Sequence, residues 1–524
     1  MIEQSGRESQ WRSNVAAYAL VVLFVGFISV EEIRGEGGLT WDDAEYLTRG
    51  YDCVRYARSK PGNAGIQVAR VGWTLLHQGF KPPLLVTWTV PWFYLLGPEH
   101  LSLVIWFASA LPFALLLIAA ARVAALTFGA RAAPLAVLCV AASPLALEFG
   151  SKVMVETFLG LWILLALHEA ARFLVRPTYS GASLLGLWAG LALLTKFTAL
   201  VLLGGPVLYF LWIWFREPRR IGLSLGLLAT CATVVLVVAG PWYARNYQNV
   251  LDHARYASQF DELALGKSDE SMRILRVPAA AGAIAGWFVV LTAVVAEILI
   301  ATRKHALPAA LPASRHLERL ALLGLLVSTI VLLFPSYFEL RFLLPAWPAV
   351  EVVVGGRCCQ AVESLGSRGG YLFAGLLALS SIYALVTVDR ELVDQRSRTY
   401  LDAGAAVAEL AKEHGVRSVA NLGDAPDWNV FKLRLASRLR PEAAQCEFRD
   451  VSKFSSEELT GSLKETDAIF VLDHDQIPPL MLQTPAMNRA YDSISAALKS
   501  EGFEPVKLTA DLDLPPVIVY VRKR

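Results

Sequence analysis

The sequence predicts an α-helical polytopic membrane protein that ends in a small α/β domain. Apolar residues make up 55% of the 524 residues and charged residues only 18%, whereas soluble domains usually carry about 25% charge. Most of the apolar residues fall in long runs that the core of a water-soluble domain could not absorb. Charges return, and apolar runs shorten to strand length, only near the C-terminal end.

Apolar runs predict eleven transmembrane helices. A helix needs about 20 mainly apolar residues to cross the hydrocarbon core. The first run, Val15 to Val30, is followed by Glu31 and Glu32 and not by a small-residue cleavage site, so we expect an uncleaved first span. The predicted spans are 15–31, 101–121, 133–149, 155–174, 182–196, 198–215, 221–240, 278–300, 320–335, 342–356 and 371–388.

Basic residues orient these spans. Lys and Arg in short loops favour the cytoplasmic side. With a cytoplasmic N-terminus and eleven passes, all six basic clusters fall on that side. The clusters are Arg7/Arg12, Arg122/Arg131, Arg172/Arg176, Arg216/Arg219/Arg220, Arg303/Lys304/Arg315/Arg319 and Arg357/Arg368. We therefore predict a multi-pass protein of the cell (inner) membrane.

The same topology places four segments outside: a loop at 31–100, a loop at 242–277, a turn at 335–341 and the tail from about residue 389. The apolar stretch Leu84–Leu96 is too short to span, so we expect a juxtamembrane helix with Trp88, Trp92, Phe93 and Tyr94 at headgroup level. The predicted domains are 1–390, which is transmembrane, and 391–524, which is extracytoplasmic.

The tail alternates strand-like and helical patterns, which indicates an α/β domain. The expected strands are Ser418–Leu422, Ala468–Leu472 and Val517–Val521, and the expected helices are Tyr400–His414 and Pro485–Ser500. The run Asp473-His474-Asp475 follows a predicted strand. These residues are either part of a functional site or ordinary polar residues of a loop.

Six cysteines show no C-x-x-C spacing and no histidine at metal-site spacing. Cys53 and Cys446 would share the outer side, where a disulfide between them is an alternative to two free thiols. The net charge of +2 gives no nucleic-acid footprint, so no nucleic-acid partner is predicted.

Ionisable residues near span ends on the outer side are the candidate site. Asp42 and Asp43 follow the first span and can act as a base or bind a divalent cation. The alternative is a solvated acidic turn. Lys81 precedes two prolines at the start of the juxtamembrane helix, where a phosphate would lie. Its alternative is a snorkelling interfacial lysine.

The remaining candidates lie farther along the chain. Glu156, near Lys152, sits about one helical turn into the fourth span, where a carboxylate needs a partner or a cavity unless it snorkels. Lys196 interrupts an apolar sequence, and Arg245 and Arg341 each lie where an outer segment meets a span. Lys and Arg are the usual ligands of phosphate groups. These acids and cations on one face predict a site for a lipid phosphate.

At this point the order of motifs resembles the C-type membrane glycosyltransferases, in particular glycosyltransferase family 39 (protein O-mannosyltransferases and aminoarabinose transferases). The likeness runs from about residue 15 to 390. Its motifs are Asp42-Asp43-Ala44-Glu45-Tyr46, Lys81-Pro82-Pro83-Leu84, Ser143-Pro144 followed by Glu156, Gly190-Leu191-Ala192-Leu193-Leu194-Thr195-Lys196, Pro241-Trp242-Tyr243 and Arg341-Phe342-Leu343-Leu344-Pro345-Ala346-Trp347-Pro348.

The resemblance implies roles for these residues. Asp42 matches the catalytic base, with Asp43 beside it where Glu is common, and Glu156 matches a second acid. Lys81 and Arg341 match donor phosphate-binding residues. Lys196 and Arg245 are weaker carry-overs to the same phosphate.

The chain also departs from the family pattern. Phe80 stands where aminoarabinose transferases tend to have Glu. No cofactor and no metal ligand are therefore assigned, although a divalent cation held by the acids stays open. The middle-loop domain of eukaryotic protein mannosyltransferases is absent, which favours a bacterial or archaeal type.

The resemblance implies that the chain transfers a sugar from a polyprenyl-phosphate donor to an acceptor lipid, glycan or protein, inverting the anomeric centre. Two rivals stay open. A flippase of lipid-linked sugars could line a path with the same charges, but such transporters often show paired halves, and no internal repeat is evident. A noncatalytic scaffold would give no reason for acids and bases to cluster on one face.

Overall fold

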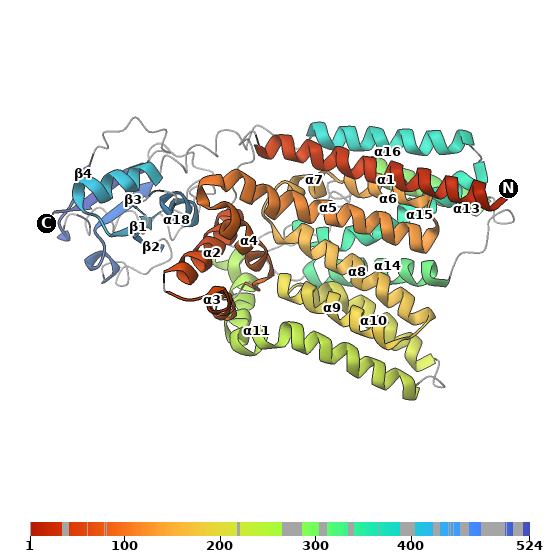
Figure 1. The fold of residues 1–524 in the computed structure, drawn as a ribbon, viewed down its shortest axis with the longest axis horizontal. Coiled ribbons are helices and arrows are strands. Elements are labelled where there is room, and N and C mark those ends of the chain that lie inside the picture. The colour runs from red at the N-terminus through yellow and green to blue at the C-terminus, as the bar shows by residue number, and fades with distance from the viewer. Residues whose placement is uncertain are drawn as a thin grey trace.

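The computed structural model is mainly helical, with a sheet at one end of its long axis (Figure 1). The start of α1 lies at the opposite end from this sheet (Figure 1). At some positions, Asp42 among them, only the backbone is described. The structure describes residues 2–33, 41–59, 61–77, 79, 81–216, 221–264, 286–302, 312–333, 340–365, 367–387, 404–422, 430–438, 440, 442–443, 445–450, 461–472, 498, 500–506 and 517–523.

Most of the helices form a bundle, in which the long ones lie side by side (Figure 1). They are α1 (Ile2–Ile33), α5 (Leu101–Phe128), α6 (Ala132–Ala141), α7 (Pro144–Gly150), α8 (Val155–Val175), α9 (Tyr179–Thr195), α10 (Ala199–Arg216), α11 (Ile221–Ala264), α13 (Trp287–Thr302), α14 (Pro312–Leu333), α15 (Trp347–Leu365) and α16 (Ser367–Thr387). Each predicted span overlaps one of these helices or, for 133–149, the pair α6 and α7.

Length and apolarity identify which described helices could cross a membrane alone. Four qualify, or five if a bent pair counts as one span, and five further apolar helices are shorter. The chain is therefore a multi-pass membrane protein, whereas the count of about eleven passes stays a prediction.

Small residues let the bundle helices approach closely. A Cβ atom added to Gly355 of α15 would lie 2.7 Å from the backbone of Ala136 in α6. One added to Gly186 of α9 would lie 2.5 Å from the carbonyl oxygen of Cys231 in α11. Close backbone approach at small residues is typical of membrane helices, because lipid offers no hydrophobic drive for their association.

The predicted span 133–149 is broken. α6 and α7 meet at an angle of 78°. Ser143 caps α7 by accepting a hydrogen bond from the backbone N–H of Ala146 at 3.1 Å, and Pro144 occupies a first-turn position. Proline lacks the N–H that would continue the α6 ladder, so this pair ends one helix and starts another. A single straight helix over 133–149 is therefore wrong.

The segment after α1 folds into three short helices, α2 (Trp41–Arg58), α3 (Ala64–Leu76) and α4 (Leu84–Leu96). α4 has the predicted bounds, but its aromatic residues do not all face outward. Trp92 stacks on Phe107 of α5 at 4.1 Å between ring centres, and Phe93 is buried. Only Tyr94 of the expected interfacial residues is exposed, so α4 is a packed element of the bundle end.

Helix α11 is longer than predicted. It passes through Pro241 and continues to Ala264, so the first part of the expected loop 242–277 is helical. Asn246 of this extension donates to the carbonyl oxygen of Leu76 at 2.8 Å, which ties α11 to the end of α3.

The tail holds a five-stranded sheet in the order β2-β1-β3-β5-β4. β1 (Ser418–Leu422) is parallel to β2 (Glu447–Asp450) and β3 (Ala468–Leu472), and β5 (Val517–Arg522) is antiparallel to β3 and to β4 (Phe503–Val506).

The three predicted strands are the central ones. The sequence pattern missed β2 and β4, which are the edge strands, because edge strands tend to carry charges that interrupt the apolar alternation. A helical segment at 404–414 agrees with Tyr400–His414, while Pro485–Ser500 and Asp473-His474-Asp475 lie almost wholly outside the described residues.

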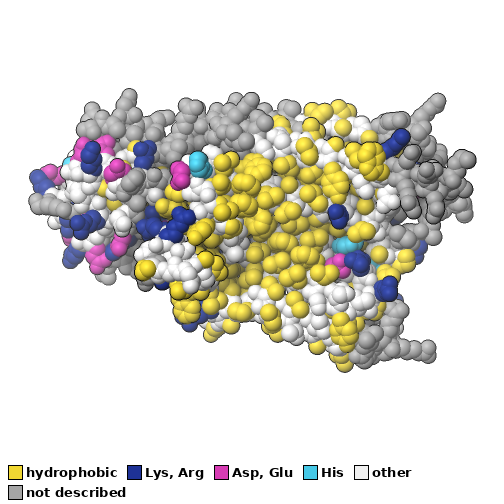
Figure 2. Space-filling view, in the orientation of Figure 1, with side chains coloured by type: hydrophobic (Ala, Val, Ile, Leu, Met, Phe, Trp, Pro, Cys, Tyr) yellow, Lys and Arg dark blue, Asp and Glu magenta, His cyan; other side chains and the backbone are white. Residues whose placement is uncertain are grey.

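Cys53 and Cys446 are both buried and are not joined by a disulfide bond, so the disulfide alternative is wrong. On the face seen in Figure 2, apolar side chains cover much of the bundle, and charged side chains gather near the sheet. Val22, Leu126 and Leu236 are among the exposed large apolar residues. This surface is suited to contact with lipid.

Candidate active site

The predicted acids lie in the first turns of α2. Asp42 is the second residue of this helix, but its side chain is outside the described part. Asp43 and Glu45 are buried. Carboxylates at a helix N-terminus are stabilised by the positive end of the helix dipole. The motif expected as a loop start is therefore a helix start, which gives the acids a fixed backbone.

Lys81 points toward this helix. Its Nζ donates to Oε2 of Glu45 at 2.5 Å, and Oε1 of the same carboxylate lies 3.3 Å from Nη1 of Arg49. Lys81 Nζ also lies 5.2 Å from the ring centre of Tyr46. Two cations thus share one carboxylate, and the group carries a net positive charge. This inward contact is not that of a snorkelling lysine.

A second ion pair joins the start of α8 to the end of α9. Glu156 is only 1% exposed, and its Oε1 accepts from Nζ of Lys196 at 2.8 Å. Lys196 follows the last residue of α9 as its C-cap. Within the described residues, Oε2 of Glu156 has no hydrogen-bond partner. Lys152, expected beside Glu156, instead donates to Glu148 at 2.6 Å.

Arg341 joins this second pair through an aromatic ring. It lies in the short helix η5 (Leu340–Phe342). The ring of Phe342 has Lys196 Nζ at 4.5 Å from its centre and Arg341 Cζ at 5.7 Å. A ring face attracts cations, which helps to hold two like charges near each other. The fold therefore brings Glu156, Lys196 and Arg341 together from three separate segments of the sequence.

Packing links the two groups of charges. Tyr46 of α2, Leu85 of α4 and Val155 of α8 belong to one buried cluster. The rings of Trp88 in α4 and Phe158 in α8 lie 5.4 Å apart. Lys81 precedes α4 and Glu156 follows Val155, so both groups lie at the bundle end that carries α2, α3 and α4, next to the sheet (Figure 1). We call this the sheet end.

Arg245 differs from the other candidates. It is exposed on α11, and no contact joins it to the residues above among those the structure describes. Its neighbour Tyr243 donates to the carbonyl oxygen of Leu193 at 2.9 Å, near the Lys196 end of α9. Arg245 therefore lies on a helix that borders the site without entering either ion-pair group.

The sequence assigns no metal ligand and leaves a divalent cation at the acids open. Among the described side chains, no three His, Cys, Asp or Glu residues are grouped so as to hold a metal ion. Asp42 and Phe80 lie outside that set. Two of the described acids, Glu45 and Glu156, form ion pairs with Lys81 and Lys196.

Sequence reasoning missed some residues of this site. Arg49 could have been found, because it is four residues after Glu45 on one helix face. Phe342 carried no signal, since an aromatic residue next to Arg341 predicts nothing by itself. The buried acid Glu45 was noted within a motif but not as the partner of Lys81, which is 36 residues away.

Comparisons with known proteins agree with this architecture. Residues 81–244 match the dolichyl-phosphate-mannose-protein mannosyltransferase family. ArnT from Cupriavidus metallidurans bound to undecaprenyl phosphate aligns with TM-score 0.57 and 15% identity, over 95% of this chain and 97% of that one. Its apo form aligns with TM-score 0.58 and 16% identity, over 96% and 98%.

Among curated proteins no sequence match was found. The matched segment 81–244 contains Lys81, Glu156 and Lys196, and the shared fold extends over nearly the whole chain. The resemblance that the motifs predicted is thus confirmed: the chain is a multi-pass membrane protein that resembles the family 39 glycosyltransferases and has the fold of ArnT.

Proposed function

We propose that this protein transfers a sugar from a polyprenyl-phosphate donor to an acceptor lipid, glycan or protein on the non-cytoplasmic side. The observation that carries the proposal is that three cations lie at the same end of the bundle: Lys81, which pairs with Glu45 of α2, and Lys196 and Arg341, which both lie near the ring of Phe342. The solved ArnT that shares this fold binds undecaprenyl phosphate, which supports a lipid-phosphate ligand here.

The cations are proposed to bind the donor phosphate by exchanging partners. Lys81 leaves Glu45 for a phosphate oxygen, while Arg49 continues to neutralise Glu45. Lys196 and Arg341, which both lie near the ring of Phe342, approach the same phosphate. Arg245 contributes charge from the border of the site. Charge-assisted bonds to phosphate in a partly buried site are stronger than in water, so such a group can hold a leaving phosphate.

Asp42 is the proposed general base, with Asp43 adjacent and Glu156 orienting the acceptor or a cation. The acceptor hydroxyl or amine gives its proton to Asp42 as its lone pair forms a bond to the anomeric carbon. The bond from that carbon to the phosphate oxygen breaks, and its electrons leave on polyprenyl phosphate. One displacement of this kind inverts the anomeric configuration. The positive side chains stabilise the leaving charge.

We further propose that the N-terminus is cytoplasmic, that the bundle makes about eleven passes of the inner membrane and that the sheet end is extracytoplasmic. The domains would be 1–390, with its outer loop at 31–100, and an α/β domain at 391–524. Basic residues support this orientation. Arg122, which contacts Tyr18 of α1, and Arg131, which contacts Glu363, both lie far from the sheet end. That places them on the side where arginine favours the cytoplasm.

Turnover of labelled polyprenyl-phosphate sugars by the purified protein tests the proposal. Asp42→Asn should lower transfer about 100- to 10,000-fold, the usual contribution of a general base. Asp252→Asn, an exposed acid on α11, is the matched control and should leave transfer unchanged. Full activity of Asp42→Asn would refute the assignment of the base.

The same assay separates transferase from flippase. A transferase consumes donor in detergent, where there is no second compartment. A flippase moves donor only across a sealed bilayer, so movement in vesicles without donor consumption in detergent would overturn the proposed function.

A further inference from the structure

The sheet region of the tail is packed directly on α2. Helix α18 (Val430–Arg438) precedes β2 and presents two buried residues, Leu435 and Ala436, to α2. These belong to the same hydrophobic cluster as Ala44 and Leu47. Ala44 lies between the candidate acid Asp43 and Glu45, so a residue of the tail shares a core with the start of the acid-bearing helix.

An ion pair reinforces this contact farther along α2. Arg438 Nε lies 3.4 Å from Oδ1 of Asp52, and the two side chains are 9% and 30% exposed. Arg438 also donates through Nη1 to the carbonyl oxygen of Cys446 at 3.3 Å. The guanidinium thus links α2 to the backbone just before β2.

Arg434, one turn earlier on α18, interacts electrostatically with Asp52 as well. It donates to the carbonyl oxygen of Phe448 in β2 at 3.0 Å. Burial lowers the pKa of its guanidinium, while the carboxylates of Asp52 and Glu45 raise it. Glu45 is the partner of Lys81. The charge of Arg434 on α18 therefore interacts with the group of residues that we propose binds the donor phosphate.

Asp52 lies ten residues after Asp42 on one helix, a distance of about 15 Å along its axis. Because hydrogen bonds along the helix hold its backbone together, a displacement of α2 at Asp52 also displaces its first turn. We propose that α18, through Arg438, positions α2 and thereby the acids at its start for transfer. Arg438 is a positioning residue in this scheme, and the inference rests on the proposed function.

Kinetics of full-length variants test the inference. Arg438→Ala should lower kcat about 10- to 100-fold, the scale of a small misplacement of catalytic groups, while the donor KM stays unchanged. Asp52→Asn removes the same pair from the partly exposed side and should show the same split. If the pair acts as a unit, the double variant should be no slower than either single variant.

Two further variants serve as control and rescue. Arg440→Ala removes an exposed arginine of the same segment and should leave kcat unchanged. Arg438→Lys keeps a cation for Asp52 and should restore part of kcat. Binding of polyprenyl phosphate to each variant counts the folded sites, so that kcat is expressed per folded site.

The outcomes separate the two claims. No transfer by the unmodified protein would defeat the proposed function. If the unmodified protein is active and both Arg438→Ala and Asp52→Asn keep full kcat per folded site, the positioning role alone would be overturned. A loss of folded sites with kcat per site unchanged would equally overturn it, because α18 would then be only structural.

Discussion

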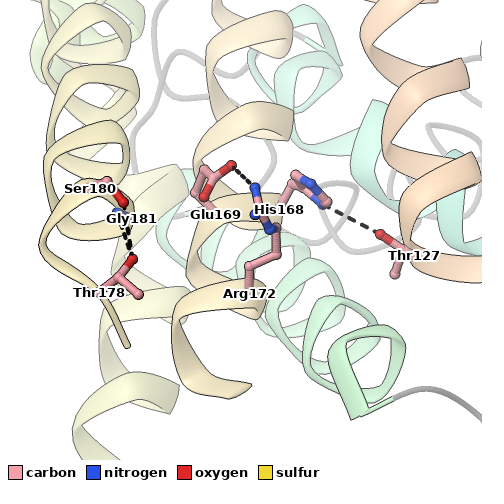
Figure 3. Close-up of polar contacts among 7 residues, drawn as sticks. All are labelled: Thr127, His168, Glu169, Arg172, Thr178, Ser180 and Gly181. Atoms are coloured by element: carbon pink, nitrogen blue, oxygen red, sulfur yellow. Dashed lines mark hydrogen bonds and ion pairs between the residues drawn. The ribbon is translucent and has the colours of Figure 1, made fainter. Parts of the chain in front are cut away.

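The two ends of helix α8 carry ion pairs of opposite character. At the sheet end, Glu156 is buried and binds Lys196 of the next helix end, 40 residues away. At the other end, Glu169, which is also buried, accepts from Arg172 three residues later on the same helix (Figure 3). The side chain of this arginine is 57% exposed. His168 contacts Thr127 of α5 nearby at 3.4 Å (Figure 3). The Glu156–Lys196 pair joins two helices, whereas the Glu169–Arg172 pair lies within one helix.

The difference teaches where this protein holds charge under constraint. In the Glu169 pair the cation is exposed, so water screens the interaction and lowers its contribution to stability. In the Glu156 pair both side chains have lost most of their hydration, so removal of one partner leaves an uncompensated charge. We infer that, of these two pairs, the one at the sheet end is under the greater constraint.

Loss of Lys196 gives the sharpest test of this contrast. Lys196→Ala leaves the buried Glu156 without its cation and should lower the free energy of unfolding by about 3–5 kcal/mol. Thermal unfolding in detergent measures the change. Lys152→Ala is the matched control, since its partner Glu148 is partly exposed, and it should cost about 0.2–1 kcal/mol. Equal losses would remove the distinction between the two kinds of pair.

Glu351 of α15 extends the comparison to a buried acid that pairs with no cation in the described part of the chain. It is 1% exposed, like Glu156, but neither carboxylate oxygen has a hydrogen-bond partner among the described residues. Glu351→Leu should therefore raise the free energy of unfolding by about 1–3 kcal/mol, the cost of an unsatisfied buried group. The same unfolding measurement applies.

Glu363→Leu is the control for that prediction, because Glu363 is partly exposed and faces Arg131. It should not stabilise the protein. If Glu351→Leu proved destabilising, Glu351 would have a role in the bundle that its described surroundings do not show.

Arg172→Ala is expected to have the smallest effect. It removes a local pair whose cation is exposed, so that water can take the place of the guanidinium beside the buried Glu169. It should cost about 0.3–0.5 kcal/mol, with sugar transfer unchanged. Unfolding and transfer assays on the same preparation check both expectations. A loss of transfer would place function at both ends of α8 and break the contrast.

The sequence was sufficient for elements whose signal is local. Apolar runs located helices at every predicted span, and α4, β1 and β3 have the predicted bounds. These patterns follow from the burial of side chains at fixed spacing along one element. The broken helix at Ser143-Pro144 was missed, although a capping residue followed by proline is a local signal of a new helix.

The amino-acid sequence by itself determined which residues could act: acids at the start of α2, Lys81 before α4, Glu156 at the start of α8 and Arg341 before α15. Only the tertiary structure decided their partners. It paired Lys81 with Glu45, Lys196 with Glu156 and Arg438 with Asp52. The physical reason is that a charge near a helix end identifies a place but not a neighbour, because the neighbour is set by how helices distant in sequence pack together.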